Sequence, residues 1–154
     1  GFVKIIKGGL MSDVFFMKMA LQEARRAFLE DEVPIGCVIV RNGEVIAVAH
    51  NQKENSNMAT YHAEILAINK ACAVLGTWHL EDCIIYTTVE PCMMCMGAII
   101  QSRISKVVYG TVNDSFGYLR KLERKKIVVE ANVLSEECSS ILSEFFQKQR
   151  RLKD

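Results

Sequence analysis

The alternation of hydrophobic and polar positions divides the chain into helices and strands. Apolar residues recur at helical spacing from a cap at Ser12 or Asp13 to about Glu30, with Glu23, Arg25 and Arg26 predicted to face water. Val33-Pro34 then breaks the pattern. Further helices are predicted at residues 62–75, 92–101 and 135–152. Short apolar, mostly β-branched runs predict strands at residues 35–40, 44–49, 83–88, 106–109 and 127–130, and residues 51–60 are predicted to form a polar loop.

The order of these elements predicts an α/β fold. Asn42-Gly43 lies between the first two strands, and this dipeptide is typical of a two-residue hairpin. Gly76 is placed to end the second helix. Because helices separate the later strands, we expect a mixed five-stranded sheet with helices on both faces.

Composition is compatible with one domain and excludes few functions. The chain has 154 residues, half of them hydrophobic, and a formal net charge of +1, so charge alone neither favours nor disfavours a nucleic-acid partner. No apolar run is long enough to span a bilayer, and no signal peptide is evident, so no membrane partner is expected. Residues 1–10 are interpreted as an N-terminal extension or an expression remnant, because Met11 is followed by a helix-cap sequence, and residues 11–154 as a single domain.

Two of the six cysteines form a closely spaced pair. Cys92 and Cys95 follow Pro91 at the start of a predicted helix, where residues three apart share one face. A helix N-terminus favours the thiolate, which is the form that binds metal. Without an export signal, this usage indicates a reducing cytoplasm and a metal or catalytic role for the pair.

A second motif, His62-Ala63-Glu64, opens another predicted helix. His62 would complete a Cys2His ligand set with an open fourth position, as in catalytic zinc sites. Glu64 would take a proton from water activated by the metal and pass it to the substrate. The combination H-x-E…P-C-x-x-C is the established signature of zinc-dependent nucleobase deaminases.

The motifs also have interpretations that involve no catalytic zinc site. The cysteines alone are equally compatible with buried thiols or a redox pair. A closed structural zinc site would need a fourth ligand, and the candidates are His50, His79 and the remaining cysteines, none of which has motif spacing. Glu64 would then have no role.

From about Met11 to Leu152 the chain resembles the cytidine-deaminase-like superfamily and, within it, the bacterial tRNA-specific adenosine deaminases. The stretches that carry the resemblance are residues 32–36 (EVPIG), Asn51, residues 62–65 (HAEI), 86–98 (YTTVEPCMMCMGA), 102–104 (SRI), 107–110 (VVYG) and 145–151.

The resemblance implies a three-layer α/β/α fold, one Zn²⁺ per chain and a homodimer. It also implies that Asn51 hydrogen-bonds the target base, that Ala63 contributes backbone contacts, and that Val33 helps to wall the pocket. The implied reaction converts adenosine to inosine at the wobble position of a tRNA anticodon, with water attacking C6 of the flipped adenine.

Two alternatives remain open. The family commonly has a Gly-rich stretch after the fourth strand, whereas residues 113–120 here are NDSFGYLR and the following segment looks shortened. This departure favours considering a deaminase of a free base or nucleoside, of the guanine or cytosine type. A non-catalytic RNA-binding subunit is disfavoured because binding alone does not need Glu64.

Two basic clusters could contact backbone phosphates or could simply be solvated surfaces. They comprise Arg120, Lys121, Arg124, Lys125 and Lys126, and then Lys148, Arg150, Arg151 and Lys153. Phe145 and Phe146 could offer a stacking surface for a base, but adjacent helical residues cannot share a face, so at least one is expected in the core.

Overall fold

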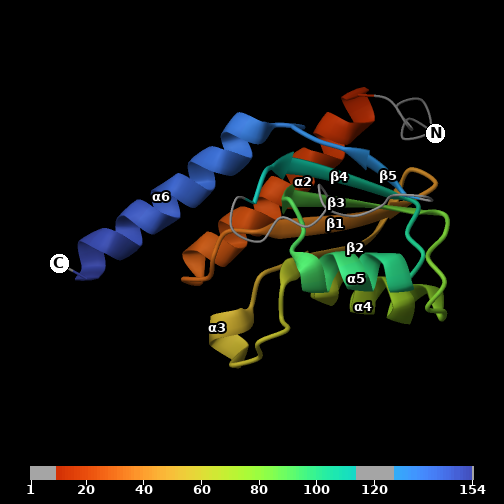
Figure 1. The fold of residues 1–154 in the computed structure, drawn as a ribbon, viewed down its shortest axis with the longest axis horizontal. Coiled ribbons are helices and arrows are strands. Elements are labelled where there is room, and N and C mark those ends of the chain that lie inside the picture. The colour runs from red at the N-terminus through yellow and green to blue at the C-terminus, as the bar shows by residue number, and fades with distance from the viewer. Residues whose placement is uncertain (1–9, 114–126, 154) are drawn as a thin grey trace.

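The structure is a computed structural model that describes residues 10–113 and 127–153, and in it five strands form one mixed sheet in the order β2-β1-β3-β4-β5 (Figure 1). The strands are β1 (Gly36–Arg41), β2 (Glu44–His50), β3 (Cys83–Val89), β4 (Lys106–Thr111) and β5 (Val128–Glu130). Strand β1 is antiparallel to both β2 and β3, whereas β3, β4 and β5 are parallel. The predicted mixed sheet is therefore confirmed.

The hairpin between β1 and β2 has the turn that its sequence predicts. Asn42 and Gly43 have φ angles of 51° and 78°. Two consecutive positive φ angles are characteristic of the type I′ turn, whose twist matches that of the flanking strands.

Helices cover both faces of the sheet and make the three-layer arrangement visible in Figure 1. They are α2 (Leu10–Leu29), α3 (Lys53–Ser56), α4 (Ala63–Leu75), α5 (Met93–Gln101) and α6 (Ser135–Lys153). Helices α4 and α5 lie below the sheet in the view, and α2 and α6 lie on the opposite face. None of the helices within residues 10–113 and 127–153 is long and apolar enough to cross a membrane.

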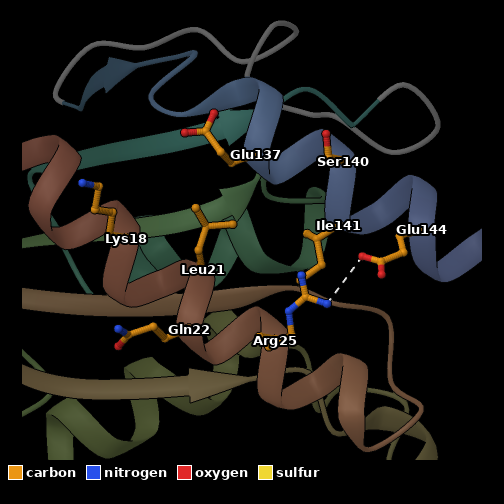
Figure 2. A pocket seen from close by; sticks show the side chains of 8 residues that line it. All are labelled: Lys18, Leu21, Gln22, Arg25, Glu137, Ser140, Ile141 and Glu144. Carbon is orange, nitrogen blue, oxygen red and sulfur yellow. Dashed lines mark hydrogen bonds and ion pairs between the residues drawn. The ribbon is translucent and has the colours of Figure 1, made fainter.

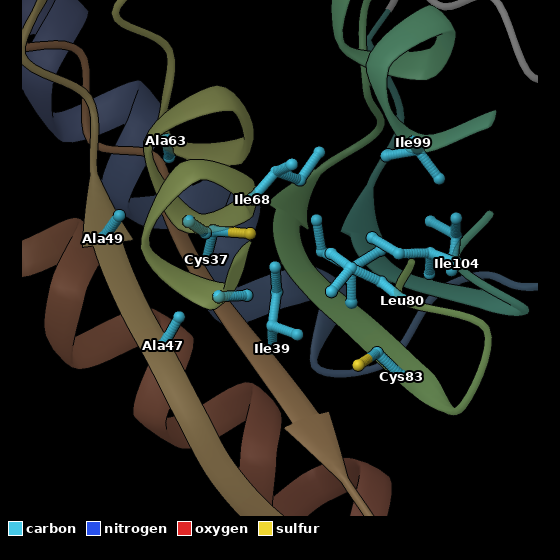
Figure 3. Packing of buried hydrophobic residues seen from close by; sticks show 14 of the residues in the cluster. Cys37, Ile39, Ala47, Ala49, Ala63, Ile68, Leu80, Cys83, Ile99 and Ile104 are labelled. Atoms are coloured by element: carbon cyan, nitrogen blue, oxygen red, sulfur yellow. The ribbon is translucent and has the colours of Figure 1, made fainter. Parts of the chain in front are cut away.

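Alternate residues of the central strands pack into two cores. Cys37, Ile39 and Ile85 face α4 and α5, as Figure 3 shows for the first two. Val38 and Tyr86 face α2 and α6 on the other side. This alternation is the consequence of the two-residue period of a strand.

Helix α2 approaches β1 very closely at Gly36. A Cβ atom at that position would overlap the carbonyl oxygen of Ala20 and lie 2.5 Å from the backbone nitrogen of Ala24. The amide of Gly36 also donates to Oγ1 of Thr88 at 3.1 Å. Only glycine allows the two backbones to lie this close.

Helix α2 differs from the prediction at two places. It already begins at Leu10, so Ser12 and Asp13 lie inside it and are buried rather than capping it. The Tyr86 hydroxyl of β3 donates to Oδ1 of Asp13 at 2.8 Å, which gives this carboxylate a tertiary role. Glu23 was expected to face water but is buried, because it contacts the ring of His50.

The segment predicted as a continuous loop contains the short helix α3. Its expected cap position, Gln52, makes no side-chain hydrogen bond to it. Instead the Glu32 carboxylate accepts the N–H groups of Glu54 and Asn55. Local sequence does not reveal this helix, because its capping group lies about twenty residues upstream.

A groove of about 440 Å³ separates α2 from α6 on the outer face (Figure 2). Arg25 of α2 reaches across it to Glu144 of α6 at 3.4 Å, and both side chains are about half exposed. Such an exposed ion pair contributes little to stability.

Three predictions fall outside the described residues. These are the N-terminal extension over residues 1–9, most of the atypical stretch at 113–120, and the basic cluster at 120–126.

Candidate active site

Two helix N-termini meet at one edge of the sheet and bring the predicted ligands together. His62 is the N-cap residue of α4 and Cys92 is the N-cap residue of α5, and neither side chain caps its own helix. Both side chains are therefore available for another partner. Cys95 lies one turn into α5 and is fully buried.

The three donor atoms form a compact group. Nδ1 of His62 lies 3.7 Å from Sγ of Cys92 and 3.5 Å from Sγ of Cys95. All three atoms lie within 4.8 Å of one another, so they could hold a metal ion. Among the described residues, His50 and His79 do not join this group.

The protonation of the donor atoms reflects their crowding. Hydrogen bonding from Cys95, with a further contribution from His62, lowers the pKa of Cys92 to about 4. The same contact with Cys92, together with burial, raises the pKa of Cys95. The hydrogen bond with Cys92 raises the pKa of His62. The thiolate form of Cys92 is thus favoured at neutral pH, which is the form that binds metal.

Glu64 lies beside the donor group and is only 5% exposed. Burial is the main reason that its pKa rises to about 7. A cation held by the donor atoms would favour the ionised carboxylate and lower this pKa again.

His62, Cys92 and Glu64 line a cavity of about 470 Å³, and the third donor residue, Cys95, is buried beside it. A pocket of this size lies within the range typical of small-molecule and nucleobase sites. Its lining combines apolar and polar side chains: Val33, Ile35, Asn51, Lys53, Glu54, His62, Glu64, Val89, Glu90, Cys92, Val112, Asn113, Leu142 and Phe146.

Of the three predicted base-binding residues, two line the cavity and one lies in the core. Asn51 and Val33 line the cavity, and Oδ1 of Asn51 is buried without a hydrogen-bond partner among the described residues. A buried polar atom of this kind needs a partner, which a ligand can supply. Ala63 is fully buried in the core cluster, and its backbone contact with a base remains a prediction.

The phenylalanine pair divides as its spacing predicts. Phe145 is buried and packs edge-on against Phe28, with ring centroids 5.9 Å apart. Phe146 is 44% exposed and lines the cavity, so it alone of the two is available to a ligand.

Sequence reasoning missed several cavity residues. Lys53 and Glu54 enter through α3, and Leu142 enters from α6. No local motif marks these positions, because the sheet and α6 bring them together from distant parts of the chain.

His50, considered from the sequence only as a possible fourth zinc ligand, contacts two carboxylates instead. Its Nδ1 lies 3.2 Å from Oε1 of Glu23, and its Nε2 lies 3.0 Å from Oε1 of Glu30. Both contacts tie the end of β2, just before Asn51, to helix α2 and the residues that follow it.

Comparison with known proteins gives the same assignment of family. The model of the MafB19-like deaminase family matches residues 11–150. A tRNA-specific adenosine deaminase of Bacillus subtilis is 43% identical over 152 residues, which cover 94% of each chain. A protein of the same name from Aquifex aeolicus is 41% identical, covering 91% of this chain and 97% of its own.

Solved structures agree with the fold. One from a study of A-to-I editing by tRNA:A34 deaminases at the wobble position superimposes with a TM-score of 0.80 at 38% identity, covering 83% of this chain and 99% of its own. A guanine deaminase from Nitrosomonas europaea superimposes with a TM-score of 0.76 at 26% identity, covering 84% and 81%. The chain therefore belongs to the MafB19-like deaminase family and is related to the tRNA-specific adenosine deaminases, and it is a hydrolytic deaminase.

Proposed function

We propose that this chain converts the wobble adenosine of a tRNA anticodon to inosine, with one Zn²⁺ held by His62, Cys92 and Cys95. The observation that carries the proposal is the donor group beside a buried carboxylate in a nucleobase-sized cavity. The relatives named for tRNA adenosine deamination support the choice of substrate.

The donor set fits zinc in chemistry and in spacing. Zinc takes bonds of about 2.3 Å to sulfur and 2.0–2.1 Å to nitrogen at tetrahedral angles, which separate the two atoms by about 3.6 Å. The observed separations of 3.7 and 3.5 Å match this value. Three protein ligands leave a fourth position open, and zinc there supplies a Lewis acid that activates water near neutral pH.

Glu64 would move the protons of the reaction. Its carboxylate would accept a proton from the attacking water and deliver it to N1 of adenine, and then help to protonate the departing amine. Water adds at C6, the C6–N bond breaks, and ammonia leaves with inosine as the product. Burial of Glu64 keeps bulk water away from this transfer.

Four further residues would contact bases of the substrate. Asn51 would offer its unsatisfied Oδ1 to an N–H group of the base. Val33 would pack against the ring, and Phe146 would stack on an unpaired base at the cavity mouth. Ala63 would contribute its backbone.

The C-terminal helix supports an RNA partner. Arg150, Arg151 and Lys153 are exposed near the end of α6, the helix that also carries Phe146. These cations are suited to contacting backbone phosphates of an anticodon stem-loop. A tRNA substrate would also place the chain in the cytoplasm.

A free-base substrate is the second candidate, because a guanine deaminase shares the fold. A substrate panel separates the two. An anticodon stem-loop is assayed for inosine, while guanine, cytosine and adenosine are assayed for released ammonia. We expect turnover of the stem-loop, and turnover of a free base without the stem-loop would overturn the proposal.

We further propose a single deaminase domain from residue 11 onward and a homodimer. The family model spans residues 11–150, which supports the first point. Helix α5 leaves Met93, Met94 and Ile100 exposed, with Met93 at 64%, and Val74 of α4 is also exposed. Exposed apolar groups of this kind favour an interface.

The dimer has a direct test. Ile100→Asp would introduce a charge on the exposed face of α5 and should shift the chain to monomer in sedimentation. Exposed Val128→Asp on β5 introduces the same charge elsewhere and should leave the mass unchanged. A wild-type chain that sediments as a monomer at micromolar concentration would contradict the dimer.

A further inference from the structure

The carboxylate of Glu32 is completely buried, and within the described part of the chain all its hydrogen-bond donors belong to the short helix α3. Its Oε1 accepts the N–H of Glu54 at 3.0 Å. Its Oε2 accepts the N–H of Asn55 at 2.6 Å and the side-chain Nδ2 of Asn55 at 2.7 Å. The exposed fraction of Glu32 is 0%.

Glu32 is itself firmly anchored. Its amide donates to the carbonyl of Ala27 at 2.9 Å, which fixes it to the end of α2. The Asn55 side chain also donates to the carbonyl of Glu30 at 2.9 Å. We call this set of contacts between residues 30–32 and residues 54–55 the Glu32 clamp.

Holding α3 through the Glu32 clamp is energetically less favourable than holding it by apolar packing. A buried carboxylate without its donors is strongly unfavourable, whereas an apolar side chain could fill the same space without that desolvation cost. Among residues 10–113 and 127–153, no Lys or Arg forms an ion pair with Glu32. Among the described residues, the N–H donors of α3 therefore compensate the negative charge of Glu32. Because hydrogen bonds are directional, they fix the orientation of α3 as well as its position.

The clamp determines where α3 stands at the cavity. Lys53 and Glu54 of α3 line the cavity, and Lys53 is exposed at its rim. Asn51 lies two residues before Lys53, the first residue of α3. The backbone amide of Asn51 donates to the carbonyl of Ile35 at 3.1 Å. A displaced α3 would move the cation of Lys53 without disturbing the donor atoms of His62, Cys92 and Cys95.

We propose that Glu32 is a positioning residue that fixes α3 so that Lys53 contacts a backbone phosphate of the nucleotide next to the target base. The inference rests on the proposed function, because it requires a polynucleotide substrate. Glu32 acts through α3 and touches neither the base nor the metal donors. It therefore governs binding of the substrate backbone rather than the proton transfers at Glu64.

The test compares four single variants and one double variant on an anticodon stem-loop. Glu32→Gln keeps the shape but turns one oxygen into an N–H₂ group that cannot accept, and Asn55→Ala removes one donor from the exposed side. Lys53→Ala removes the proposed phosphate contact. Glu44→Gln, at an exposed position of the β1–β2 hairpin, is the matched control for the loss of one negative charge. Each is assayed for kcat and KM at several salt concentrations.

We expect Glu32→Gln to raise KM about tenfold, since one charge-assisted hydrogen bond corresponds to roughly that factor. Asn55→Ala should raise it less, and kcat should change less than KM in both. The slope of log KM against log salt should fall by about 0.7, the value for one phosphate contact on a single strand. Lys53→Ala should reduce the slope equally, and the Glu32→Gln/Lys53→Ala double variant no further.

Several results would overturn the inference. Additive effects of Glu32→Gln and Lys53→Ala would mean that the two act separately. A salt slope for Glu32→Gln equal to that of Glu44→Gln would mean that the clamp does not position a phosphate contact. Loss of zinc in Glu32→Gln would indicate general disruption of the site instead.

Hydrogen exchange of the backbone amides distinguishes failure of this inference from failure of the proposed function. In Glu32→Gln, the amides of residues 54 and 55 should exchange at least about tenfold faster, with the amides of α4 unchanged. Unchanged exchange at residues 54 and 55 would overturn the clamp whatever the substrate. A wild-type chain inactive on the stem-loop would overturn the proposed function, whereas an active wild type with Glu32→Gln indistinguishable from Glu44→Gln would overturn the inference alone.

Discussion

At the scale of single residues, the most specific prediction concerns the effect of Glu64 on kcat. Glu64→Gln keeps the shape of the side chain but removes its ability to accept a proton. We expect kcat to fall by at least about 100-fold, because general acid–base catalysis contributes roughly that much or more. Zinc content should stay near one per chain, because Glu64 is not one of the three grouped donors.

The control for this change is Glu44→Gln, which should retain wild-type kcat. Activity of Glu64→Gln within a few-fold of wild type would remove Glu64 from the proton pathway. Measuring zinc by elemental analysis on the same preparation separates loss of chemistry from loss of metal.

A second residue-scale prediction concerns stability. Tyr86 is almost fully buried, and its hydroxyl donates to Oδ1 of Asp13. Tyr86→Phe would leave that buried carboxylate without this donor, at a cost of about 1–3 kcal/mol in the free energy of unfolding. Urea denaturation measures the loss, and a change below about 0.5 kcal/mol would mean that the bond is not important.

Residue roles were predictable where a short motif carries the chemistry. His62, Glu64, Cys92 and Cys95 were identified from two motifs, and the structure brings the three donor atoms together. Glu32 and His50 could not be identified in this way. Their partners lie 20–27 positions away in the sequence, so their roles depend on tertiary packing.

At the scale of elements, the packing of α2 on β1 depends on a missing side chain. Gly36→Ala would force its Cβ against the backbone of α2 at Ala20 and Ala24. Because backbone atoms cannot move aside as a flexible side chain does, we expect a loss of about 1–3 kcal/mol or more. Thermal or urea unfolding gives the value directly.

Gly97→Ala is the matched comparison. Gly97 lies within α5, and a Cβ there would meet nothing within 4 Å. Gly97 shares the exposed face of α5 with Met93 and Ile100, so both glycine variants are compared in the monomeric Ile100→Asp background. There Gly97→Ala should stabilise the helix by about 0.5–1 kcal/mol. If the two substitutions changed stability equally, close approach at Gly36 would not be the reason for its glycine.

Most of the elements were predicted to within a few residues, because strand and helix periodicities are local properties. The β1–β2 hairpin followed from Asn42-Gly43 alone. The segment that forms α3 was predicted as a loop because the Glu32 carboxylate, rather than a local cap, accepts its first N–H groups. The predicted cap residues Ser12 and Asp13 lie inside α2. Glu23 was misplaced because its burial depends on His50.

At the scale of the whole molecule, the metal would tie α4 and α5 together at their N-termini. A ligand that binds only the folded state at 100 times its Kd adds about 2.7 kcal/mol to stability. For a chain of this size, removing zinc with a chelator should lower Tm by about 5–11 °C. Calorimetry with and without added zinc measures the shift.

His62→Ala is the control, because it deletes one of the three donors. Its Tm should not respond to zinc. An equal response in His62→Ala and wild type would show that the stabilising ion binds elsewhere.

The separation of the donor residues along the chain also determines when the ligand set can be completed during translation. His62 leaves the ribosome 33 residues before Cys95. At 5–20 residues per second, the ligand set stays incomplete for about 2–7 s after His62 is made. Moreover β1 must wait for β3 before it has a neighbour on that side. The ligand set proposed to hold zinc is therefore complete only once Cys95 has been made, when residues 96–154 are still to follow.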